Sequence, residues 1–167
     1  MLKAVAGKSF RVVIDASANR DDRGPFYDNA MANIVAGAKQ VGAKQVIIHS
    51  SIGVGASEAI FTGPNAKVPT PNWERLKPSM IDKGGAETHV VQSGISYTII
   101  RNGMIDAEGS PLTGKAKLVE DEMAFSRITR ADLARLTAEC LDQVRCANKL
   151  FHAVDESLVG PRPPRGR

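Results

Sequence analysis

The stretch from Ser79 to Met104 reads SMIDKGGAETHVVQSGISYTIIRNGM. Apolar residues at helical spacing in its first half, Ile81, Val90 and Val91, predict a helix. The helical pattern stops at Ser93-Gly94, and the apolar run of residues 97–100 that follows is typical of a buried strand. The stretch therefore predicts a helix that leads directly into a strand.

The same organisation extends toward the amino end of the chain. Residues 10–15 and 45–49 are apolar strand patterns, and between them a helical pattern runs from Asp28 to about Val41. Strands with apolar residues on both faces are typical of parallel sheets, and the short connections predict a right-handed strand-helix-strand unit. In such sheets ligands bind at the carboxyl ends of the strands. We therefore expect any chemistry to collect near Arg101, Asn102 and Gly103, at the end of the strand in the opening stretch.

The remaining segments complete one α/β domain, expected to span residues 1–158. Residues 52–78 are rich in glycine and proline and are interpreted as a long loop, either a lid or binding loop or a mobile segment. Residues 116–119 are a candidate short strand, and residues 149–154 are the last strand. Between them Thr129 and Asp132 form a variant of the capping box that begins a helix.

The charge pattern argues against a nucleic-acid-binding protein. The formal charge is +4 at pH 7, but three arginines lie in the carboxyl-terminal GPRPPRGR, which leaves +1 for the residues before it. A nucleic-acid interface needs a basic face with interleaved aromatic residues, and the body of the chain shows neither. Residues 159–167 are poor in apolar residues and are expected to be a disordered basic tail.

The cysteines and the hydropathy predict a cytoplasmic protein. Cys140 and Cys146 lie six residues apart on what is interpreted as one helical pattern, so they are expected to point in different directions and to form neither a disulfide nor a metal pair. No other cluster has the spacing of metal ligands. No apolar run approaches the ~20 residues of a membrane span, and the first residues are too weakly apolar for a signal peptide.

Five motifs, in order, resemble the atypical short-chain dehydrogenase/reductase superfamily. They are Asp15-Ala-Ser-Ala, Val46-Ile-Ile-His-Ser-Ser, Lys83 followed by Glu87, Ser93-Gly-Ile-Ser-Tyr-Thr-Ile-Ile-Arg-Asn-Gly, and Ser126-Arg-Ile-Thr-Arg-Ala-Asp-Leu-Ala. The chain is most similar to the NAD(P)H-binding, NmrA-like and flavin-reductase-like branches, over nearly all of residues 10–155. The resemblance implies a Rossmann-like fold and NADP or NAD as the cofactor.

The resemblance also implies which residues form the site. Asp15, Ala16, Ser17 and Ala18 would lie beside the adenine-ribose and pyrophosphate side of the cofactor. Ser50 and Ser51 would occupy the place of the substrate-facing serine. Lys83 would bind the nicotinamide ribose and lower a neighbouring pKa, while Asn102, Gly103 and Met104 would flank the nicotinamide. The expected catalytic residues are Ser50, Ser51 and Lys83.

The chain departs from the family pattern at two of these positions. The tyrosine that classical members carry four residues before the lysine is Ser79 here, and a serine hydroxyl is far too weak an acid to replace a phenol without help. The family's Arg-Pro-Gly is Arg101-Asn102-Gly103, which is a milder change.

A third departure concerns the front of the fold. Family members begin with a strand and a Gly-x-x-Gly-x-x-Gly turn that places the pyrophosphate at a helix amino terminus. Nothing before Phe10 supplies this turn, and Gly53-Val-Gly55 follows the wrong strand. We therefore expect a truncated Rossmann-like parallel sheet with flanking helices. Its strand at residues 10–15 would be an open apolar edge, covered by a second copy of the chain in a homo-oligomer or by a rearranged segment.

Each site residue also has a purely structural interpretation. Lys83 and Glu87 are one helical turn apart and could form a surface ion pair. Ser50 and Ser51 could satisfy backbone groups at a strand end. His49 is expected to be a hydrogen-bonded core histidine, and Arg101 to pair with Glu87 or Asp106.

Three functions follow from these observations. The first is an NAD(P)-binding oxidoreductase-like protein acting on an unknown small molecule. The second is a catalytically silent, NmrA-like binding or regulatory module. The third is an enzyme that performs acid-base chemistry in the same cleft without a cofactor. The sequence does not distinguish NAD from NADP.

Overall fold

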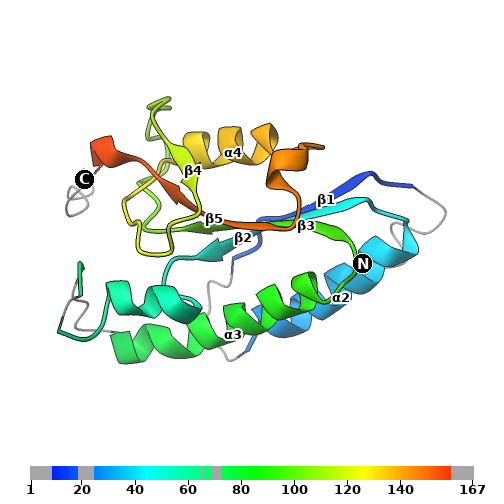
Figure 1. The fold of residues 1–167 in the computed structure, drawn as a ribbon, viewed down its shortest axis with the longest axis horizontal. Coiled ribbons are helices and arrows are strands. Elements are labelled where there is room, and N and C mark those ends of the chain that lie inside the picture. The colour runs from blue at the N-terminus through cyan, green and yellow to red at the C-terminus, as the bar shows by residue number, and fades with distance from the viewer. Residues whose placement is uncertain (1–8, 19–24, 65, 69–72, 159–167) are drawn as a thin grey trace.

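The structure, a computed structural model, describes residues 9–18, 25–64, 66–68 and 73–158 (Figure 1). A five-stranded sheet in the order β1-β2-β3-β5-β4 forms its centre. The strands are β1 (Val12–Asp15), β2 (Gln45–Ser51), β3 (Ser96–Asn102), β4 (Lys117–Val119) and β5 (Lys149–Val154). Helices α2 (Tyr27–Gln40) and α3 (Trp73–Val91) cover one face of the sheet, and α4 (Arg130–Glu139) covers the other.

The strand pairing confirms the predicted Rossmann-like α/β fold. β1, β2, β3 and β5 pair in parallel, with Val13 beside Val46 and Ile48 beside Ile99. Only the short β4 runs antiparallel, along the outer side of β5. β1 lies at the opposite edge, as predicted, and among the described residues it pairs with β2 alone.

Two apolar cores lie on the two faces of the sheet. One packs Val46, Ile48 and Ile99 against α2 and α3, and the other packs Ile47 and Ile100 against α4. Successive residues of a strand point to opposite faces, so a strand buried on both faces must be apolar at every position. This is why β2 and β3 were recognisable as parallel strands in the sequence.

The predicted loop at residues 52–78 is partly wrong. A short 3-10 helix, η1, spans Gly55–Ile60, and α3 begins at Trp73, so that Pro78 lies inside the helix. Proline normally ends a helix because it lacks an N–H group. Here tertiary packing holds the first turns of α3, since Trp73 is buried, stacks on Phe61 with ring centroids 5.1 Å apart and donates from Nε1 to Glu58 at 3.0 Å.

Helix α4 begins as the sequence predicts. Thr129 is the N-cap, and its hydroxyl oxygen accepts a hydrogen bond from the Asp132 backbone N–H at 3.0 Å. Leu133, Leu136 and Cys140 then face the sheet. The capping residues thus place the apolar side of α4 against the core.

The prediction for the cysteines is wrong, because Cys140 and Cys146 form a disulfide. They do not share one helix. α4 ends at Glu139, and the chain then reverses through Asp142, whose φ of 56° is in the left-handed region, into a second 3-10 helix, η2 (Val144–Cys146). The turn brings the two Cα atoms to 5.5 Å, within the range that a disulfide bridges.

Reduction of this disulfide is expected to lower the free energy of unfolding by about 2 kcal/mol, because the cross-link restricts the unfolded chain over a short loop. Urea unfolding with and without a phosphine reductant measures the difference. The Cys146→Ser variant is the control, and its urea midpoint should be the same with and without the reductant. Equal midpoints for the wild-type protein in both conditions would contradict the prediction.

Two further sequence predictions concern the carboxyl-terminal tail and membrane-spanning helices. The basic tail, residues 159–167, lies outside the described residues. Within the described ranges no helix has the length and apolar character needed to cross a membrane.

Candidate functional site

The carboxyl ends of three strands bring the predicted site residues to one edge of the sheet. Ser51 at the end of β2 lies beside Asn102 at the end of β3, and Ser50 lies beside Arg101. β1 ends three residues short of Ser51, with Asp15 beside Ile48. The parallel topology predicted this arrangement, because parallel strands present their carboxyl ends at the same edge.

Ser50 belongs to a buried polar network and not to an open site. Its hydroxyl donates to Glu87 Oε1 at 2.6 Å, and Arg101 donates to the same carboxylate from Nε at 2.9 Å and from Nη2 at 2.7 Å. All three residues are at most 7% exposed. The predicted Arg101–Glu87 pair is therefore confirmed, whereas the surface pair of Glu87 with Lys83 is wrong. Asp106 pairs with Arg127 instead.

Lys83 reaches from α3 to the end of β2, where its Nζ donates to Ser51 Oγ. Its ammonium group also lies 4.7 Å from the centroid of the Tyr27 ring. Burial lowers the pKa of Lys83, and the negative charges of Glu87, Asp15 and Asp82 oppose this effect only in part. Ser51 and Lys83 thus form a hydroxyl-amine pair at the carboxyl edge, 32 residues apart in the chain.

The other predicted cofactor residues lie at the ends of β1 and β3 or directly after these strands. Asp15 lies close enough to interact electrostatically with Lys83, and Ala16, Ser17 and Ala18 are exposed beyond the end of β1. Met104 is 42% exposed. Gly103 has a packing role, because a Cβ there would lie 2.4 Å from the Ser126 carbonyl oxygen.

His49 is half-buried and points to the face of the sheet that α4 covers. Its Nε2 lies 2.7 Å from the Thr137 hydroxyl of α4. Burial lowers the pKa of His49, and the charge of Asp15 opposes this shift. The predicted structural role is confirmed.

Asp82 is a residue that the sequence interpretation missed. Its carboxylate, on α3, accepts hydrogen bonds from the backbone N–H groups of Phe26, Tyr27 and Asp28 at 2.7, 2.8 and 3.1 Å. These N–H groups lie at the start of α2, whose N-cap residue makes no side-chain cap. The acidic group that caps α2 therefore comes from a different helix, and no local motif in the sequence signals it.

Replacing Asp82 with alanine is expected to lower the free energy of unfolding by about 1–2 kcal/mol, because helix caps contribute this much. Burial acts to raise the pKa of Asp82, but the three amide donors and Lys83 lower it overall. A folded-state pKa below the unfolded one adds stability at neutral pH that is lost as the pH falls through the folded pKa. The variant should therefore show a flatter acid limb in unfolding experiments at several pH values.

Glu74→Ala is the matched control for this experiment, since Glu74 is an exposed carboxylate in the first turn of the same helix. It should change neither the stability nor its pH dependence by a comparable amount. An Asp82→Ala variant as stable as the wild-type protein would contradict the capping role.

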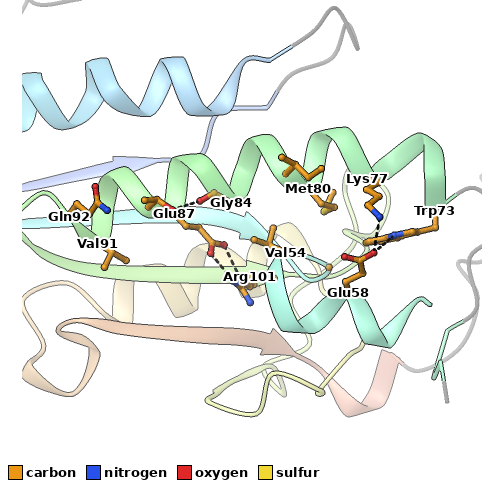
Figure 2. Close-up of a pocket in the computed structure, with 14 residues that line it drawn as sticks. Val54, Glu58, Trp73, Lys77, Met80, Gly84, Glu87, Val91, Gln92 and Arg101 are labelled. Carbon is orange, nitrogen blue, oxygen red and sulfur yellow. Dashed lines mark hydrogen bonds and ion pairs between the residues drawn. The ribbon is translucent and has the colours of Figure 1, made fainter. Parts of the chain in front are cut away.

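A cavity of about 390 Å³ lies on the flank of α3 that faces η1, away from α2 (Figure 2). Ile81 and Val91 line it and are 67% and 50% exposed, whereas Val90 on the same helix is buried. Trp73 and the Arg101–Glu87 pair also line it. Lys83 and Ser51 are not among the lining residues, so the cavity is separate from the strand-end pair.

Within the described residues no cluster of three or more histidine, cysteine, aspartate or glutamate side chains could hold a metal ion. The side-chain chemistry at the strand ends is that of a hydroxyl, an amine and carboxylates.

The sequence was compared with protein families and with known proteins, and both comparisons found relatives. A family profile described as NAD(P)H-binding matches residues 1–144. The sugar epimerase YhfK of Bacillus subtilis (strain 168), itself uncharacterized, is 38% identical over 82 residues, which is 48% of this chain and 36% of that protein.

Solved structures share the fold. ChuY, an anaerobillin reductase from Escherichia coli O157:H7, superimposes with a TM-score of 0.70 at 21% identity, covering 90% of this chain and 66% of that one. The oxidoreductase ylbE from Lactococcus lactis gives a TM-score of 0.72 at 19% identity, covering 93% and 65%. The chain thus spans about a third of the curated relative in sequence and less than two thirds of these two structures.

Proposed function

We propose an NAD(P)-dependent oxidoreductase function for this chain, because the chain belongs to the NAD(P)H-binding family. The protein would be an oxidoreductase of the atypical short-chain dehydrogenase/reductase type that acts on an unknown small molecule. The contact of Lys83 with Ser51 at the carboxyl edge of the sheet is the observation that carries it.

The residues at this edge fit the nicotinamide half of the cofactor. A ribose offers hydroxyl groups, and a lysine amine beside a serine hydroxyl can donate to and accept from them. We assign Lys83 to the nicotinamide ribose, Ser51 to the substrate side, and Asn102, Gly103 and Met104 to the flank of the nicotinamide ring. Ser50 is left out as a catalytic residue in this proposal, since its hydroxyl is committed to buried Glu87.

The fit is poorer on the pyrophosphate side. Among the described residues, Gly53 and Gly55 lead only into the short 3-10 helix η1, and the start of α2 is already filled by the Asp82 carboxylate. A phosphate placed there would meet a negative charge instead of free N–H groups. We therefore propose that Asp15, Ala16, Ser17 and Ala18 line the adenine-ribose side of the cofactor.

The cofactor, when bound, supplies a hydride to the substrate. The chain's own residues orient it and manage the proton. Lys83 carries positive charge that favours an oxygen anion developing nearby, and its lowered pKa brings its proton closer to the range used in general acid catalysis. The Ser79 hydroxyl is too weak an acid to replace a phenol, so a proton donor other than Ser79 is required.

Titration calorimetry with NADH and NADPH tests the proposal. We expect binding in the micromolar to millimolar range, weakened at least about tenfold by Lys83→Met, since a hydrogen bond to a charged group contributes ~1.5–3 kcal/mol. Lys39→Met is the matched control, because Lys39 is an exposed lysine on α2. No heat at millimolar ligand would reject the cofactor and favour the silent, NmrA-like regulatory module.

We also propose that β1 is covered in solution by another strand, from a second copy of the chain. Phe10 and Ile14 are 39% and 48% exposed at this edge, and an exposed apolar edge strand promotes association. Native mass spectrometry should detect a dimer that Ile14→Lys dissociates. A wild-type monomer at micromolar concentration would contradict this.

A cytoplasmic location is proposed as well. It predicts that the Cys140–Cys146 disulfide of the structure is reduced to two thiols in the cell, because the cytoplasm is reducing. Alkylation before lysis, followed by mass spectrometry, checks this. A fully oxidised pair in intact cells would contradict the cytoplasmic assignment.

A further inference from the structure

The pair of Ser51 and Lys83 has the composition of a nucleophile and its base. Lys83 Nζ donates to Ser51 Oγ, and the neutral amine in the same position would accept the hydroxyl proton. Serine activated by lysine is a known arrangement for attack on acyl groups. Ser51 lies at the carboxyl end of β2 and is half-buried, in contrast to Ser50 before it, which is buried.

The neighbouring serine cannot play this part. Ser50 is 3% exposed, and its hydroxyl proton is donated to Glu87. Ser79 is on the same helix as Lys83, but within the described residues no hydrogen bond joins the two. The geometry therefore singles out Ser51.

Asn102 supplies the third group that acyl transfer needs. It is the register partner of Ser51 on the adjacent strand, and side chains of register partners lie on the same face of a sheet. Asn102 Nδ2 donates one hydrogen to the Gly103 carbonyl at 3.0 Å, which leaves its second N–H available. An amide donor of this kind stabilises the oxyanion of a tetrahedral intermediate.

We propose that Ser51 is a lysine-activated nucleophile that attacks small activated esters, independently of any nicotinamide cofactor. Ser51 Oγ forms a bond to the acyl carbon while Lys83 takes the hydroxyl proton and Asn102 donates to the oxyanion. The ester C–O bond then breaks, and Lys83 returns the proton to the leaving oxygen. Water hydrolyses the acyl-serine by the same route, which releases a carboxylic acid and restores Ser51.

The charges around Lys83 define the pH dependence of this step. Glu87 and Asp82 face it from its own helix and Asp15 from β1; the Tyr27 ring packs on it from α2 and Ser51 from β2. Burial lowers the pKa of Lys83 despite the three carboxylates. The amine therefore loses its proton below the ordinary range for lysine, and the rate of attack should rise with pH through that lowered pKa.

Labelling with an alkyl fluorophosphonate tests the proposal without any cofactor. The probe transfers its phosphonyl group to an activated serine with loss of fluoride. We expect one adduct, mapped to Ser51 by peptide mass spectrometry, and a labelling rate that increases with pH. Lys83→Arg keeps the positive charge but cannot act as a base, so it should slow labelling at least about 100-fold.

Two further variants separate catalysis from folding. Asn102→Ala should lower the labelling rate on the order of tenfold or more, through loss of the oxyanion donor. Ser79→Ala is the control and should label at the wild-type rate, and circular dichroism verifies that each variant is folded. The proposal is wrong if no adduct forms under conditions that label a serine esterase completely, if the adduct lies elsewhere, or if Lys83→Arg labels as fast as the wild-type protein.

Discussion

Replacing Arg101 with leucine is expected to lower the free energy of unfolding by about 3–5 kcal/mol, because it leaves a buried carboxylate without its partner. Arg101 and Glu87 have side chains only 6% and 9% exposed and share two hydrogen bonds. Removal of the guanidinium would leave Glu87 with the Ser50 hydroxyl as its remaining donor among these contacts. Urea denaturation followed by circular dichroism measures the loss.

A double variant identifies the cause of this loss. Glu87→Leu combined with Arg101→Leu removes both charges together, and such replacements cost much less than breaking the pair. We therefore expect the double variant to be more stable than Arg101→Leu alone. Arg145→Leu is the surface control, since its carboxylate partner is 4.0 Å away and its side chain is 69% exposed. Losses that simply add in the double variant would show that the ion pair is not the reason.

Replacing Asp132 with alanine is also expected to have a large effect. It should lower the free energy of unfolding by about 3 kcal/mol. Asp132 is fully buried, and its carboxylate accepts hydrogen bonds from Thr113 N at 2.8 Å, Gly114 N at 3.1 Å and Thr129 Oγ1 at 2.7 Å. The carboxylate thus ties the loop at residues 113–114 to the start of α4. Its removal leaves several donors without an acceptor.

The same variant should change the acid sensitivity of the protein. Burial acts to raise the pKa of Asp132, but the hydrogen bonds from Thr113, Thr129 and Gly114 lower it overall. The folded-state pKa is then below the unfolded one, so the stability it adds is present at neutral pH and disappears as the pH falls through the folded pKa. Asp132→Ala should therefore lose less stability on acidification than the wild-type protein. Glu139→Ala, at the exposed end of α4, is the control. If Asp132→Ala lost as much stability on acidification as the wild-type protein, the prediction would be wrong.

Half of the candidate site could be predicted from the chain alone. Ser51, Asn102 and Asp15 end apolar strand patterns, and parallel strands must present those ends together. Lys83 was expected there through the resemblance of its motif. Asp82 and Tyr27 were missed, because their contacts depend on how α2 lies against α3. No local pattern encodes the relative placement of two helices.

By itself the sequence determined the parallel sheet, the two helix-covered faces and the strand ends at which polar residues collect. These features follow from local periodicity and from the handedness of short connections, which need only neighbouring residues. Tertiary structure alone decided that Glu87 pairs with Arg101 and not with Lys83, that α3 extends back through Pro78 to Trp73, and that Cys140 meets Cys146. Each of these results depends on distant groups competing for the same partner or the same space, and that competition is settled only when the chain is packed.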